Sequence, residues 1–126
     1  MKEQDPQLTM LIELILPKEI FKYFDVINIV DHSSQVDIYL DEKNNPPEEY
    51  IHDKLTSKGF SPEITIQDFP LRNKSLYLHI RRRKWINETS GKIITRNWNS
   101  VAKGTRMTNE FASFLKGLLG FIPDQQ

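Results

Sequence analysis

Apolar residues recur at helical spacing near both ends of the chain, and they alternate with polar residues across its middle. Asp5 and Pro6 have the character of a helix cap and a first helical position, and residues 8–15 carry leucine and isoleucine three and four positions apart. Met10 and Leu14 make this helix apolar nearly all round. A helix of that kind is deeply buried or shared, and we favour a partner chain, including a second copy of this chain.

A short helix carrying Ile20, Phe21 and Phe24 on one face is predicted after Pro17. A longer helix is predicted at the other end, over residues 105–122, with Thr108 as its cap. The apolar stripe of that last helix consists of Met107, Phe111, Phe114, Leu115, Leu118 and Leu119.

The middle of the chain predicts antiparallel β-hairpins, because runs with a period of two are separated by turn residues. The expected strands are 26–30, 36–40, 64–67, 76–85 and 92–98, with turns at 31–34, 70–74 and 87–91 and one helical turn at 48–50. The pattern indicates one α+β domain over residues 1–126, with a helical segment at 1–25, an antiparallel β region at 26–100 and a C-terminal helix at 105–122.

The stretch 76–98 carries the most distinctive chemistry, four consecutive cations from Arg81 to Lys84. If 76–85 is one strand, Tyr77, His79, Arg81, Arg83 and Trp85 share a face opposite Leu76, Leu78 and Ile80. A cationic face bounded by aromatic residues suits phosphates and bases. A solvated edge that prevents aggregation is the alternative, and the two tryptophans suit a core equally well.

Charge is divided unequally between the halves of the chain, although the formal net charge is +0. Residues 1–63 contain thirteen acids and six lysines, a balance of −7, and residues 64–126 contain eleven basic residues and four acids, a balance of +7. This division favours a half that faces a polyanion, supported by an acidic half.

Signals for catalysis are weak in this sequence. It has no cysteine, its three histidines are scattered, and its five glycines form no phosphate loop. Acidic pairs such as Asp41 and Glu42 are expected to be solvated. We therefore expect no catalytic residue, no metal, no cofactor and no enzymatic activity. Without a membrane-length apolar run or a basic signal-peptide start, the protein is expected to be cytoplasmic, with no membrane partner.

Three short motifs carry a family resemblance: the run Asp68-Phe69-Pro70-Leu71, the pair Arg82-Arg83, and Gly104, Arg106 and Thr108 at the start of the last helix. With the flanking sequence from residue 59 to 115, they resemble the N-terminal region of bacterial insertion-sequence transposases of the ISL/ISAon type. Residues 44–50 and 87–91 stand where that family has its two cysteine pairs. The resemblance implies a zinc-ribbon-like domain that is held by hydrophobic packing instead of zinc. It also implies a split form, in which a separate chain carries catalysis.

These features together predict a protein that binds double-stranded DNA at the terminal inverted repeats of an insertion sequence, beside a catalytic transposase chain. An adaptor that binds only protein, through its N-terminal or C-terminal helix, is the alternative. The expected DNA-binding residues, with the tryptophans as supports of the ribbon, are Arg72, Lys74, Arg81, Arg82, Arg83, Lys84, Trp85, Arg96, Trp98, Lys103 and Arg106.

Overall fold

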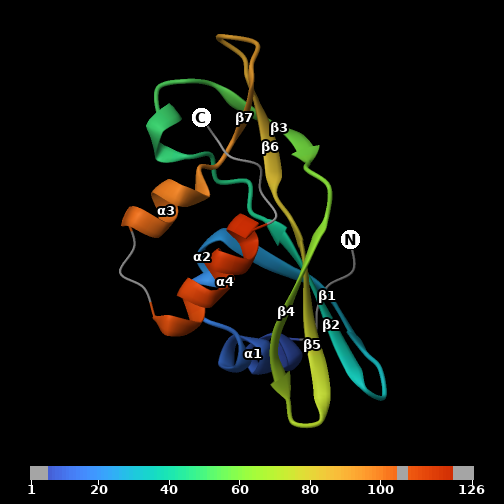
Figure 1. Ribbon diagram of the computed structural model, residues 1–126. Helices are drawn as coiled ribbons and strands as arrows, with labels where there is room; N and C mark the ends of the chain where they lie inside the picture. The colour runs from blue at the N-terminus through green and yellow to red at the C-terminus, as the bar shows by residue number, and fades with distance from the viewer. Residues whose placement is uncertain (1–5, 105–107, 121–126) are drawn as a thin grey trace.

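The computed structural model describes residues 6–104 and 108–120, and these residues form two β-sheets with helices along one face of the larger sheet (Figure 1). The helices are α1 Pro6–Ile15, α2 Ile20–Tyr23, α3 Trp98–Gly104 and α4 Asn109–Gly120, with one 3-10 turn, η1, at Glu48–Tyr50. The strands are β1 Phe24–Asp31, β2 Gln35–Glu42, β3 Leu55–Phe60, β4 Ile64–Leu71, β5 Lys74–Arg81, β6 Arg83–Asn87 and β7 Ile93–Thr95. The predicted α+β class is confirmed.

The larger sheet has the strand order β1-β2-β5-β4, and its central pair, β2 and β5, is parallel. The flanking pairs β1–β2 and β4–β5 are the predicted hairpins. A wholly antiparallel region at 26–100 was therefore the wrong expectation. Hairpin signals report only strands that are neighbours in sequence, whereas a parallel pair needs a long crossover, which residues 43–73 provide here.

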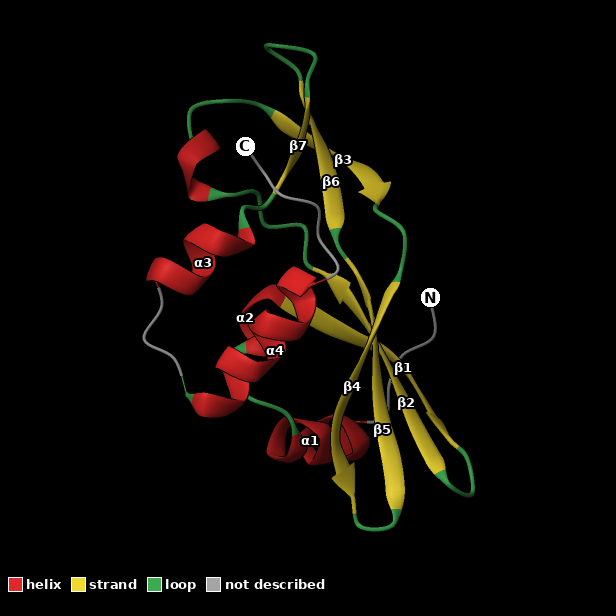
Figure 2. Ribbon diagram, viewed as in Figure 1, coloured by secondary structure: helices red, strands yellow, loops and turns green. Residues whose placement is uncertain are grey.

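The main core lies between the larger sheet and α1, α2 and α4, which all cover the same face (Figure 2). Alternation along β2 and β5 directs one set of side chains to this face, including the fully buried Ile38, Leu78 and Ile80. From α4, Phe111, Phe114, Leu115 and Leu118 pack onto them at helical spacing, as the sequence predicted.

The cap of α4 is also as predicted, because the Thr108 hydroxyl accepts the backbone N–H of Phe111 at 3.2 Å. The predicted ends of that helix, 105–107 and 121–122, lie outside the described residues, and so does Arg106. The N-terminal helices end earlier than the predicted segment 1–25, since β1 begins at Phe24.

The predicted strand 76–85 is two strands that belong to different sheets, β5 in the larger sheet and β6 in a smaller sheet of order β3-β6-β7. Burial explains the break. The core-facing residues of β5 are even-numbered (Leu76, Leu78 and Ile80), whereas those of β6, Trp85 and Asn87, are odd-numbered. A single straight strand cannot bury both sets on one face. At Arg82 the buried positions therefore change from even-numbered to odd-numbered residues. The shared face from Tyr77 to Trp85 was therefore a wrong expectation.

The return strand is also shorter than predicted, since β7 covers only Ile93–Thr95 and Trp98 starts α3. The Trp98 ring stacks on Phe24 at 5.4 Å between ring centroids and meets Tyr23 edge-on at the same distance. Asn97 caps the start of α3, since its Oδ1 accepts the backbone N–H of Ser100 at 3.1 Å.

The smaller sheet extends beyond one end of the larger sheet, away from the turn between β4 and β5 (Figure 1). We call β3, β6 and β7 with the turn 88–92 the arm. No helix in the described part of the chain is long and apolar enough to cross a bilayer.

Candidate nucleic-acid interface

Arg81, the first of the four consecutive cations, is paired within the fold. The parallel register of β2 and β5 places Arg81 beside Asp41. Arg81 donates to both carboxylate oxygens of Asp41, from Nε at 2.7 Å and from Nη2 at 2.5 Å. These hydrogen bonds raise the pKa of the Arg81 guanidinium. A bidentate pair of this kind leaves Arg81 little free charge for an external phosphate.

Glu42 binds Arg83 and Arg96 at the joint between the two sheets. Its carboxylate accepts Arg96 Nε at 2.8 Å and the backbone N–H of Arg83 at 3.0 Å. Its carbonyl oxygen accepts Arg83 Nε at 3.0 Å. Glu42 is only 1% exposed, and burial raises the pKa of its carboxyl against the opposing effect of Arg96. The expectation that Asp41 and Glu42 are solvated was wrong.

The guanidinium of Arg96 is enclosed by aromatic rings. It lies 5.2 Å from the ring centroid of Tyr23, 5.8 Å from that of Trp85 and 5.9 Å from that of Trp98. It also donates to the backbone oxygen of Asn45. Contacts of this kind stabilise a cation inside a fold, so Arg96 holds the joint and does not present its charge to solvent.

Both tryptophans are core residues, which was one of the two alternatives. Trp85 is fully buried, and its Nε1–H donates to Asn44 Oδ1 at 2.9 Å. Trp98 is buried in the main core. In this structure neither ring can contact a nucleic acid, and their contribution is to support the arm and the joint.

The remaining predicted cations do not gather in one place. Arg82 is half-buried, its Nε has no hydrogen-bond partner among the described residues, and burial lowers the pKa of its guanidinium. Lys74 pairs with Asp31 at 2.6 Å. Arg72 is exposed in the turn between β4 and β5, and Lys103 is exposed on α3. Of the cluster from Arg81 to Lys84, only Lys84 lies on an open surface of the arm.

Lys84 belongs to the outer face of the arm. Pairing places Lys84 beside Thr95, and Ile86 between Thr56 and Ile93, all on the side opposite Trp85. Alternation along β3 puts Lys58 on the same side, and Lys54 and Lys92 lie at its ends. None of these four lysines forms an ion pair with any described residue. We call Lys54, Lys58, Lys84 and Lys92 with Thr56 and Thr95 the lysine face.

Three of these lysines were not among the predicted DNA contacts. Lys54 and Lys58 were missed because β3 itself was missed. Its alternation is short and ends at Gly59, whose φ of +82° suits glycine. The usable signal was the alternation of Leu55 and Ser57 with Thr56 and Lys58. Lys92 was counted with the basic half and placed at the start of the predicted strand 92–98, whereas β7 begins at Ile93 and leaves Lys92 in the turn.

The face of the larger sheet that lies away from the helices carries a polar network. His79 Nε2 contacts Asp37 Oδ1 at 2.7 Å, and His79 Nδ1 contacts Thr65 Oγ1 at 3.1 Å. His32 lies 3.1 Å from the other carboxylate oxygen of Asp37. The hydrogen bond with His79 lowers the pKa of Asp37 and outweighs the effect of burial.

Among residues 6–104 and 108–120, no group of three or more histidine, aspartate or glutamate side chains could hold a metal ion. Comparisons with protein-family models, with curated proteins and with solved structures found no match for this chain.

Proposed function

We propose that this chain binds double-stranded DNA through the lysine face of its arm, as the DNA-recognising component of an insertion-sequence transposase. The lysines would contact phosphates on both sides of a groove, and the hydroxyls of Thr56 and Thr95 would add hydrogen bonds. Within the three-stranded arm, β6 and β7 form an antiparallel pair, and a two-stranded β-ribbon fits the major groove of B-DNA, which is about 12 Å wide.

One observation carries the proposal: Arg81, Arg83 and Arg96 are hydrogen-bonded inside the fold, whereas the lysines on the outer face of the arm form no ion pair with any described residue. A buried or bidentate pair keeps its charge within the protein. Free lysine ammonium groups on a rigid ribbon attract phosphates and release counterions when they bind them. The Glu42 joint supports this arrangement, because it fastens the arm to the larger sheet.

The finer part of the proposal rests on the family resemblance of residues 59–115. In this part of the proposal, the binding site lies in the terminal inverted repeats of the insertion sequence, and a separate transposase chain carries out catalysis. A protein that recognises element ends must prefer one duplex sequence, and the lysine face alone supplies no such preference. Base contacts from the arm, or a second DNA contact elsewhere on the chain, would have to supply it.

The test is a titration of the purified chain against a duplex carrying the terminal repeat that flanks its coding sequence, and against a scrambled duplex, at several salt concentrations. If all four lysines bind phosphates, a plot of the logarithm of the association constant against the logarithm of the salt concentration should have a slope of about −3.6. Replacing both lysines in Lys58→Glu/Lys84→Glu should reduce that slope by about 2 and weaken binding strongly.

Lys116→Glu is the matched control, because Lys116 is an exposed lysine on α4, away from the arm. It should bind DNA as the unmodified chain does. Equal binding to the repeat and to the scrambled duplex would refute recognition of element ends. Binding that survives Lys58→Glu/Lys84→Glu would refute the lysine face as the interface.

A further inference from the structure

The described surface has a concentrated apolar patch on α1 and at the edge strand β4. It consists of Met10, Leu11, Leu14 and Ile15 on α1, and Phe69 on β4. Their exposed fractions are 65%, 55%, 82%, 38% and 70% in that order. The four helix residues are three and four positions apart and form one stripe, while Ile12 on the adjoining side of α1 and Leu16 just after its end enter the core.

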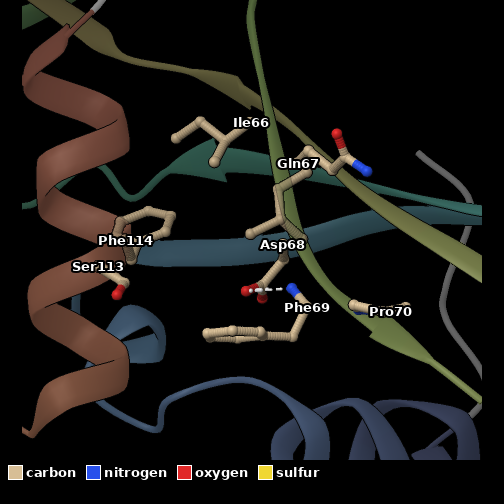
Figure 3. A pocket seen from close by; sticks show the side chains of 8 residues that line it. Ile66, Gln67, Asp68, Phe69, Pro70, Ser113 and Phe114 are labelled. Carbon is tan, nitrogen blue, oxygen red and sulfur yellow. Dashed lines mark hydrogen bonds between the residues drawn. The ribbon is translucent and has the colours of Figure 1, made fainter.

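Phe69 connects this stripe to α4. It lies where the pairing of β4 with β5 is interrupted between Asp68 and Leu71. Its ring extends from the strand toward α4, near Phe114 (Figure 3). One hollow of about 360 Å³ lies between Phe69 and Phe114, and another of about 360 Å³ lies between Phe69 and the residues Leu14 and Ile15. Large exposed side chains and the hollows that could receive such side chains therefore share one surface.

We propose that this surface is the interface of a homodimer, formed by two copies of this chain around a twofold axis. In a twofold interface the same patch meets itself, so it must carry both the projecting side chains and the hollows that accept them. The stripe of α1 projects, as does Phe69, and the two hollows lie beside them. Leu14 or Phe69 of one copy would fill a hollow of the other.

The apolar area of the patch is large enough for a second copy of this chain to form a stable dimer on it. At ~200 Å² for a large apolar side chain, the exposed fractions leave about 600 Å² of apolar surface on each copy. Two copies would bury about 1,200 Å² from these side chains alone, which reaches the lower bound of stable interfaces. A single exposed apolar patch of this size is at the upper end of what monomers carry.

The test is sedimentation equilibrium of the purified chain without DNA. The unmodified chain should be dimeric, and Leu14→Lys should raise the dimer dissociation constant by about 100-fold or more, because each dimer loses two buried leucines and gains two charges. Ile51→Lys is the matched control, since Ile51 is 76% exposed but lies outside the patch. It should remain dimeric. A monomeric unmodified chain, or a Leu14→Lys variant that dimerises normally, would overturn the proposal.

Cross-linking provides a second readout that does not depend on a disruptive substitution. The chain has no cysteine, so a single Leu14→Cys substitution gives one reactive thiol per copy. A bis-maleimide cross-linker, which spans a longer distance than a disulfide, should produce a covalent dimer from Leu14→Cys and little from Ile51→Cys, and equal yields would overturn the proposed interface. The proposal is independent of DNA binding, because Lys58→Glu/Lys84→Glu should remain dimeric even if the lysine face proves not to bind DNA.

Discussion

Removing the carboxylate of Glu42 should destabilise this protein more than any surface charge change. In Glu42→Ala, Arg96 keeps its charge inside a ring of aromatic side chains and loses its carboxylate partner at 2.8 Å. The backbone N–H of Arg83 loses its acceptor at 3.0 Å as well. Breaking a buried ion pair on one side costs about 3–5 kcal/mol, and an unsatisfied buried N–H costs about 1–3 kcal/mol. Since these costs overlap, we expect a loss of about 4 kcal/mol, a large part of a typical stability of about 5–15 kcal/mol.

Urea unfolding followed by tryptophan fluorescence measures this loss directly, because both tryptophans lie beside Arg96. The matched control is Asp25→Ala. The Asp25 side chain is 64% exposed and lies 3.9 Å from the Lys43 ammonium, so its removal should cost less than about 1 kcal/mol. The double variant Glu42→Ala/Arg96→Met should be less destabilised than Glu42→Ala alone, because the uncompensated cation is gone. A Glu42→Ala variant no less stable than Asp25→Ala would refute the view that this pair joins the two sheets.

Two further predictions concern the larger sheet and α4. The hydrogen bond with His79 lowers the pKa of Asp37 below its ordinary value of 3.8, so this group stabilises the fold above that value and the stabilisation is lost as pH falls through the folded-state pKa. Urea midpoints between about pH 5 and pH 2 should therefore fall more steeply for the unmodified chain than for Asp37→Asn, and parallel curves would contradict this. Thr108→Ala removes the hydroxyl that accepts the Phe111 N–H, and it should cost about 1 kcal/mol, or about 3–6 °C in thermal unfolding. Thr108→Ser, which keeps the hydroxyl, should recover most of that loss.

The helices and hairpins of this protein could be predicted because their causes are local. The stripe of α4, its threonine cap and the turn between β1 and β2 all follow from residues within a few positions of one another. The break at Arg82 could not be predicted in this way. The buried residues of β5 are even-numbered and those of β6 odd-numbered, but the apolar Ile86 continues the even-numbered pattern of β5, so alternation alone did not divide the strand.

The candidate interface could not be predicted in the same way, because it depends on how the charges are distributed in space. The sequence divides acids and bases between its halves, but the parallel pairing of β2 with β5 brings the two halves together. Asp41 then neutralises Arg81 across 40 residues, and Glu42 neutralises Arg96 across 54. Alternation along a strand reports which face is buried, and it carries no information on which distant strand lies alongside.

By itself, then, the sequence determined the α+β class, the two hairpins of the larger sheet, the capped last helix and the apolar character of α1. Tertiary structure decided which cations remain free, which acids are buried, and that the tryptophans support the arm from inside. The physical reason is the distance along the sequence over which each interaction acts. Helix periodicity, caps and turns act over a few residues, whereas ion pairing and burial depend on neighbours that only the assembled sheets bring together.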